Sequence, residues 1–255
     1  MKKLLLCLLT AVLVAGLSGC VRMHSATEIK DDGSGTATLD LSLSQSTADA
    51  IKEMQAIDPS ASGDMEMPDF TDIDRTNIDK VAKQYDVKVT EFENSSADGR
   101  LSVRMAFAFK DLKGLSAVMA AAMGEDPEEG MGIYATGDGN YVLKQATYEF
   151  PDYPELEDDA DEEEAAPAAP TEPSPEQMQK QMEIMGKLMG AMAELDVNLQ
   201  ITVPGDIIET NAPVQDGRTS IWTINSSNMM TAGSDMDPVI TFSGKGLKIK
   251  GALTE

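Results

Sequence analysis

Alternation of apolar and polar residues around glycine turns is the feature that most restricts the fold of this chain. Residues 101–109 read LSVRMAFAF, so every second side chain is large and apolar, and the others are small or polar. A period of two is typical of an antiparallel strand with one buried face. Asp98-Gly99 precedes this segment, and YDVKVTEFE precedes the turn. Together these segments predict a β-hairpin.

The same pattern recurs four more times. The predicted turns are DDGSG at 31–35, GDGN at 137–140, Asp216-Gly217, and GKG at 244–246. We expect the third of these turns to join DIIETN to TSIWTI and the fourth to join PVITF to LKIK. The alternating segment VNLQITV, residues 197–203, is expected to lead into these last two hairpins.

Helical periodicity separates the strands in four places. The predicted helices cover 46–57, 77–85, 111–123 and 175–195. Strands outnumber helices and are joined by hairpins. The predicted fold class is therefore α+β, with an antiparallel, hairpin-rich sheet and helices packed on one face of it.

An acidic, proline-rich segment interrupts this pattern. Residues 154–175 carry eight acids in the ten positions 155–164, followed by four prolines. Charge repulsion and proline oppose a packed core, which predicts a disordered insertion. A calcium-binding tract is the alternative, but the glycine and alternating ligands of an EF-hand loop are missing. We expect residues 20–153 and 176–255 to form two parts of one ectodomain, and a separate domain over 176–255 is the alternative.

The N-terminus has the layout of a secretory signal. Lys2 and Lys3 precede an apolar run of fourteen residues that ends in small residues. As a helix this run would cover about 21 Å, less than a hydrocarbon core of about 30 Å. Residues 1–19 are therefore predicted to be a signal peptide that is removed.

Cys20 ends the sequence Leu17-Ser18-Gly19-Cys20, which resembles the lipobox of bacterial lipoproteins. This resemblance implies that Cys20 carries acyl chains and becomes the mature N-terminus, while Cys7 leaves with the signal peptide. Two or three acyl chains give stable attachment to a membrane. We therefore expect a protein anchored by lipid on the extracytoplasmic face of the cell membrane or the outer membrane. Val21 follows the cysteine in place of an aspartate, which favours the outer membrane in a cell that has two.

The net charge of the chain restricts the classes of partner that the protein can bind. The net charge is −24 for the whole chain, and removal of two lysines with residues 1–19 makes it −26. Such a surface repels nucleic acid and anionic headgroups. We expect no nucleic-acid partner.

No catalytic site emerges from the sequence. The one histidine, His24, lies four residues from the predicted anchor, and no GxSxG, HExxH, P-loop or CxxC motif is present. Carboxylates gather in residues 64–79, where we expect a solvated loop that leads into a helix. The prediction is a protein that is not an enzyme, with no cofactor and no metal site.

The helix over 175–195 carries a stripe of methionines at helical spacing. Its members are Met178, Met182, Met185, Met189 and Met192. Such a stripe is first of all the core face of an amphipathic helix. Methionine also lines adaptable apolar surfaces, and Gly186 and Gly190 loosen this helix. These methionines are therefore the candidate ligand-binding residues, for an amphiphile held between the helix and the sheet.

Two stretches resemble the LppM-like family of bacterial lipoproteins. They are GCVRMHSATEIKDDGSGTATLDLSLS at 19–44 and ITVPGDIIETNAPVQDGRTSIWTI at 201–224. The resemblance implies an envelope protein with an α+β ectodomain and a role in binding envelope lipid. Many relatives end in a transmembrane helix, whereas this chain ends in LKIKGALTE, so we expect the lipid to anchor it alone.

These observations predict a non-catalytic binding module for an envelope lipid or another amphiphile. The alternative is a structural or scaffold lipoprotein that recruits protein partners in the cell envelope through its acidic surface.

Overall fold

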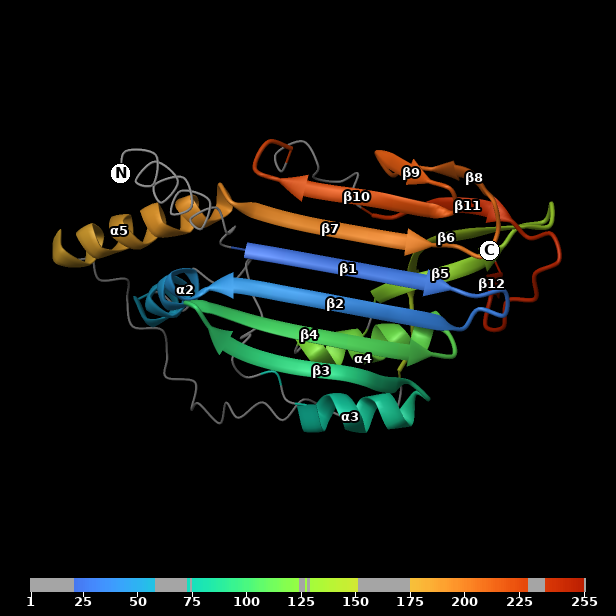
Figure 1. The fold of residues 1–255 in the computed structure, drawn as a ribbon, viewed down its shortest axis with the longest axis horizontal. Helices are drawn as coiled ribbons and strands as arrows, with labels where there is room; N and C mark the ends of the chain where they lie inside the picture. The colour runs from blue at the N-terminus through green and yellow to red at the C-terminus, as the bar shows by residue number, and fades with distance from the viewer. Residues whose placement is uncertain are drawn as a thin grey trace, which may run out of the picture.

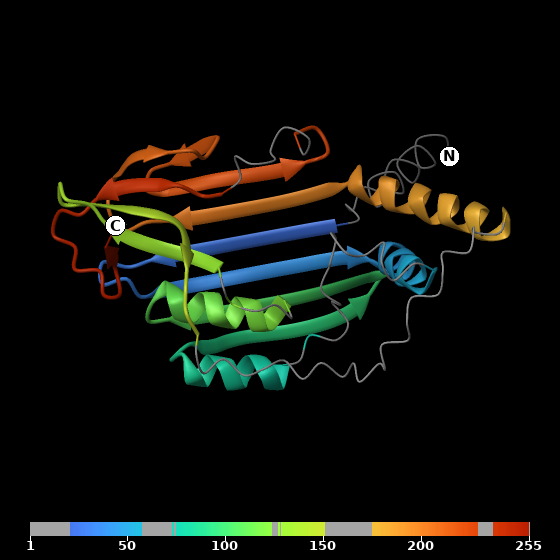
Figure 2. The same cartoon turned by 180° about the vertical axis from the view of Figure 1, so that it is seen from behind.

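The protein has an α+β fold, seen here in a computed structural model. The structure describes residues 21–57, 73, 75–123, 127, 129–150, 175–228 and 237–254. Within these ranges, two β-sheets and four helices surround one main core (Figure 1, and from behind in Figure 2). Cys20 and residues 154–174 lie outside the described residues.

The larger sheet has seven strands in the order β3-β4-β2-β1-β7-β10-β9. Neighbouring strands are antiparallel except β1 and β7, which run parallel with Val21 opposite Leu195. A strand that follows the acidic segment therefore lies at the centre of the sheet beside the first strand. The strands are β1 (Val21–Ile29), β2 (Gly35–Ser44), β3 (Lys88–Ala97), β4 (Arg100–Phe109), β7 (Leu195–Thr202), β9 (Val214–Asp216) and β10 (Thr219–Asn225).

The alternating pattern decides which side of this sheet is buried. Along β4 the large apolar residues of LSVRMAFAF are all buried, and Arg104 between them is exposed. In β2, Leu39 and Leu41 are buried in the same way, opposite Met105 and Val103 of β4. One face of the sheet therefore meets the core, and the other face is polar.

The smaller sheet has five strands in the order β12-β5-β6-β11-β8. It contains strands from both sides of the acidic segment, and β12 pairs in parallel with β5. The strands are β5 (Glu129–Ala135), β6 (Asn140–Thr147), β8 (Ile207–Thr210), β11 (Ile240–Ser243) and β12 (Leu253–Thr254).

Three of the five predicted hairpins are confirmed, namely β1–β2, β3–β4 and β5–β6. The fourth is wrong in its first strand, because Asp216-Gly217 joins β9 to β10 while β8 pairs with β11 in the other sheet. The chain turns after β8, where the Ala212 amide donates to Thr210 Oγ1 at 3.1 Å. Pro213 follows and cannot donate a backbone hydrogen bond to a sheet.

The fifth hairpin is also wrong. Gly244 does form a turn, accepting a hydrogen bond from the Leu247 amide at 3.0 Å, but residues 247–250 form no strand. Their backbone instead lies along the β1–β2 turn. The Lys248 amide donates to the Asp31 carbonyl at 3.2 Å, and the Lys250 amide donates to the Asp32 carbonyl at 2.9 Å.

All four predicted helices are confirmed, and no end differs by more than three residues. They are α2 (Gln45–Ile57), α3 (Arg75–Gln84), α4 (Leu112–Met123) and α5 (Pro175–Met192). Ser44 Oγ accepts the Thr47 amide at 3.2 Å before α2, and Asp111 Oδ1 accepts the Gly114 amide at 2.8 Å before α4. Side chains at these positions satisfy amides that a helix start leaves without partners.

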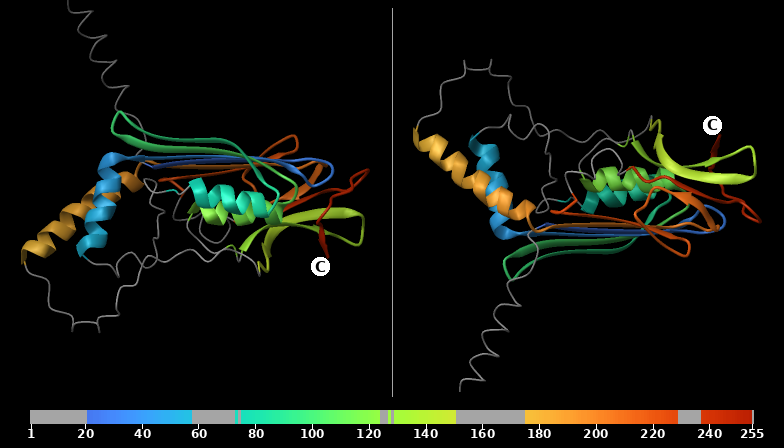
Figure 3. Two further views of the ribbon diagram at one scale, coloured as in Figure 1. Left: turned by 90° about the horizontal axis from the view of Figure 1, so that it is seen from below. Right: turned by 90° about the horizontal axis from the view of Figure 1, so that it is seen from above.

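The helices occupy two places. As Figure 3 shows, α3, α4 and the smaller sheet lie on the same face of the larger sheet, and α2 and α5 project beyond one end of it. Ile78 and Val81 of α3 and Val118 of α4 are fully buried there with Phe107 of β4. No helix in the described part of the chain is long and apolar enough to cross a membrane.

Candidate ligand-binding cleft

A cleft of about 330 Å³ opens between α4 and the larger sheet. One wall is a single face of α4, whose residues recur at intervals of three and one. They are Leu112, Leu115, Ser116, Met119, Ala120 and Met123. The opposite wall comes from β1, β2 and β7, and the start of β5 and Pro238 complete the lining.

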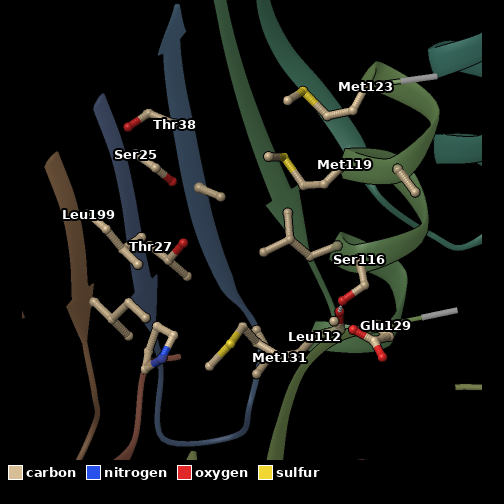
Figure 4. A pocket seen from close by; sticks show the side chains of 16 residues that line it. Ser25, Thr27, Thr38, Leu112, Ser116, Met119, Met123, Glu129, Met131 and Leu199 are labelled. Atoms are coloured by element: carbon tan, nitrogen blue, oxygen red, sulfur yellow. Dashed lines mark hydrogen bonds between the residues drawn. The ribbon is translucent and has the colours of Figure 1, made fainter. Parts of the chain in front are cut away.

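Three methionines contribute flexible side chains to this lining. Met119 and Met123 point from α4 toward the strands, and Met131 of β5 lies at the other end of the cleft, near Leu112 (Figure 4). All three are partly buried and pack against the main core. A flexible, polarizable thioether can adjust to ligands of different shape. This wall can therefore accept an irregular apolar group.

A few hydroxyl groups interrupt the apolar lining. Ser25 and Thr27 come from β1, and Ser116 comes from α4. The Ser116 hydroxyl donates to the Leu112 carbonyl at 2.9 Å, so its hydrogen is already engaged within the helix. Among the described residues of the lining, Glu129 is the one that carries a charge. The arrangement suits a mainly apolar ligand with a small polar part.

The first residues of β5 approach α4 very closely. Gly130 lies where an added Cβ would collide with the side chain of Ser116, and at Gly132 it would come within 2.6 Å of the Ala146 Cβ. The Tyr148 hydroxyl donates to the Met131 carbonyl at 2.8 Å, which holds this part of β5 in place. Partial burial raises the pKa of the Tyr148 phenol above its ordinary value.

Trp222 lies next to the cleft and is the one tryptophan of the chain. It is 2% exposed, and it pairs across β10 and β7 with Leu199, a residue of the lining. Side chains opposite each other on antiparallel strands lie about 5 Å apart at Cβ. The indole is therefore a natural reporter of what enters the cleft.

The predicted place of the methionine stripe is wrong. Met178, Met182, Met185 and Met189 are 50%, 65%, 52% and 66% exposed, and the side chain of Met192 is outside the described part of the structure. The buried face of α5 carries Ile184 and Ala191 instead, and it packs on α2. The places over the sheet are taken by α3 and α4. The four described methionines are neither core nor the wall of a groove over the sheet, and ligand contact by the stripe stays a prediction.

The other sequence candidates are spread apart. His24 lies on β1, where its Nε2 is 3.3 Å from Asp196 Oδ2 of β7, on the polar side of the sheet. Most of the acidic loop at 64–79 is outside the described residues, and Asp79 on α3 pairs with Arg75 at 3.3 Å. No cluster of three or more metal-ligating side chains occurs within the described ranges.

Sequence reasoning missed the cleft. The sequence gives only a weak signal for the cleft, because α4 is apolar almost all round, which is typical of an ordinary buried helix. The spacing of Met119 and Met123, one helical turn apart, is the one hint that the sequence offered.

Comparison with solved structures gives a match to the folded domain of LppM from Mycobacterium tuberculosis, determined by NMR. The match has 13% sequence identity and a TM-score of 0.39, and it covers 88% of this chain and 89% of that chain. No family model matches the chain, and no curated protein sequence matches it.

Proposed function

We propose that this protein is a non-catalytic binding module, anchored by lipid to the extracytoplasmic face of a bacterial envelope membrane. Its ligand is an amphiphile such as an envelope lipid, held in the cleft between α4 and the seven-stranded sheet. The observation that carries the proposal is the cleft itself, which joins an apolar, methionine-rich wall to a few hydroxyl groups.

The size of the cleft supports a small ligand or one part of a larger one. Its volume of about 330 Å³ is at the lower end of the roughly 300–1,000 Å³ typical of small-molecule sites. A site of this size can hold an acyl chain, with the headgroup left outside.

The positions of the reactive groups support the proposal that the module is not catalytic. A serine or cysteine nucleophile needs a base within hydrogen-bond reach. His24 alternates along β1 with Ser25 and Thr27, so it lies on the side of the sheet opposite the cleft. Cys7 and Cys20 are the two cysteines, and the proposed processing removes the first and acylates the second.

Quenching of Trp222 fluorescence tests the binding site. The mature protein is titrated with a fatty acid that carries bromine atoms on its chain. Because Trp222 pairs with Leu199 at the cleft wall, we expect saturable quenching. Ala120→Leu, which adds bulk to the cleft, should weaken it, while Met182→Ser on the exposed face of α5 should leave it unchanged.

The alternative is a scaffold that recruits protein partners and holds no amphiphile. Native mass spectrometry of the protein purified from membranes separates the two functions. A binder carries lipid that organic solvent extracts. An empty protein, together with quenching that does not saturate, would reject the cleft as a lipid site.

A further inference from the structure

The exposed apolar side chains of the described structure are concentrated on α5. Seven large apolar side chains are exposed among the described residues, and four of them, Met178, Met182, Met185 and Met189, lie on α5. The other three are Ile208 of β8, Val214 of β9 and Val239, which directly precedes β11. An apolar group of this kind on a protein surface marks an interaction site.

Packing against α2 fixes the direction in which this stripe faces. Ile184 is 1% exposed and Ala191 is 3% exposed, and both lie on the side of α5 that meets α2. The four methionines follow a different line along the same helix, at steps of four, three and four residues. Because the other face of α5 packs on α2, the four methionines are kept on the outward side of the helix.

The first described strand begins beside the end of the same helix. α5 ends at Met192, and β7 begins at Leu195, which is the register partner of Val21 in β1. Cys20 is the residue directly before Val21. The end of the sheet at which β1 begins is also the end beyond which α2 and α5 project (Figures 1 and 3).

The charge of α5 suits contact with a lipid headgroup region. The whole chain carries a net charge of −24, but α5 contains two lysines and two glutamates and is neutral. Lys187 and Glu183 form a pair at 3.2 Å on this helix. The helix α5 itself therefore adds nothing to the repulsion that the net charge of the protein produces near anionic headgroups.

We propose that Met178, Met182, Met185 and Met189 of α5 insert into the headgroup–acyl boundary of the membrane that holds the protein. This inference rests on the lipid anchor of the proposed function and adds a second contact to it. Amphipathic helices bind membranes by lying in this boundary with the apolar face buried. With 18 residues, α5 is about 27 Å long. A contact of that length orients the protein on the membrane, which acyl chains on one residue do not.

A single introduced thiol tests the contact. The proposed processing leaves no free cysteine in the mature protein, so Met182→Cys or Met189→Cys can be labelled alone with a polarity-sensitive fluorophore. Gln179→Cys is the matched control, because Gln179 is exposed on the same helix and lies off the stripe. The acylated protein is reconstituted into phosphatidylcholine vesicles, some of which contain nitroxide-labelled lipid.

We expect the labels at Met182 and Met189 to shift to the blue, to be quenched by nitroxide lipid and to be shielded from iodide in water. The label at Gln179 should remain open to iodide. If the stripe labels of vesicle-bound protein are as open to iodide as Gln179, the inference is overturned and the anchor stands.

Shielding from iodide without nitroxide quenching also overturns the inference. It would show that a second copy of the chain, or a segment outside the described residues, covers the stripe. Protein that fails to float with the vesicles would refute the lipid anchor itself, and the inference would fall with it.

Discussion

Gly130 of β5 lies so close to Ser116 of α4 that the space holds no Cβ between them. This contact joins the smaller sheet to the helix that forms one wall of the cleft. The backbone of Gly130 and the side chain of Ser116 both belong to the lining. The size of the cleft is therefore set in part by the lack of a side chain at residue 130.

Gly130→Ala should destabilise the protein and narrow the cleft. The new methyl group must push Ser116 aside, and overpacking of this kind typically costs about 1–3 kcal/mol. Gly137→Ala is the matched control, since nothing lies within 4 Å of a Cβ at that position. Denaturant unfolding followed by Trp222 fluorescence measures both variants. Equal stability of the two would show that β5 and α4 are not in such close contact.

Local signals made most of the elements predictable. The glycine turns correctly predict three hairpins, and apolar periodicity correctly predicts four helices. Both signals lie within a few residues of the element that they predict. The parallel pairing of Val21 with Leu195 had no such signal. Strands far apart in sequence pair through packing in the finished fold, and no turn fixes their register.

The cleft could not be predicted for a related reason. Its lining comes from strands and a helix that are far apart in the chain. On α5, periodicity correctly indicated an apolar face, but the helix has two. The face with Ile184 and Ala191 is the buried one, and it packs on α2. Spacing alone does not say which of two apolar faces a neighbour will cover.

Replacement of residues 154–174 by a glycine–serine linker of equal length should leave stability nearly unchanged. Those residues connect β6 to α5, and a linker of equal length keeps the span and a similar cost of loop closure while it removes the charge. Equal length matters because Phe150 packs against Tyr85, just after α3, and α3 lies well away from α5 (Figure 1). The measurement is the free energy of unfolding of the linker variant. A large loss would show that the acidic residues make structural contacts.

Tyr148 should make stability depend on pH in the alkaline range. Burial raises its pKa above the ordinary 10.0, so the folded state holds the phenol proton more tightly than the unfolded state. This contribution is complete below pH 10 and is lost as the pH rises from 10 toward the folded-state value. The unfolding free energy of the natural protein should therefore fall more steeply above pH 10 than that of Tyr148→Phe. Parallel curves would show that the phenol titrates normally.

Cys20→Ala should abolish acylation. The lipobox resemblance assigns the thioether-linked lipid to this cysteine, and no other thiol remains in the predicted mature chain. Cells fed an alkyne fatty acid should label the natural protein and the Cys7→Ala control, whose mature sequences are the same. Label retained in Cys20→Ala would remove the basis for a lipid anchor.

Ile184→Ala and Met182→Ala test the two faces of α5 against each other. Ile184 is 1% exposed against α2, and removing a buried isoleucine typically costs about 2–5 kcal/mol. Met182 is 65% exposed, and surface substitutions usually change stability by less than about 0.5 kcal/mol. Because α5 packs mainly on α2, the loss should appear as local opening of these two helices. Hydrogen exchange of the purified protein in solution measures this opening. A protected α5 in Ile184→Ala, with a destabilised one in Met182→Ala, would mean that the methionine stripe is the packed face after all.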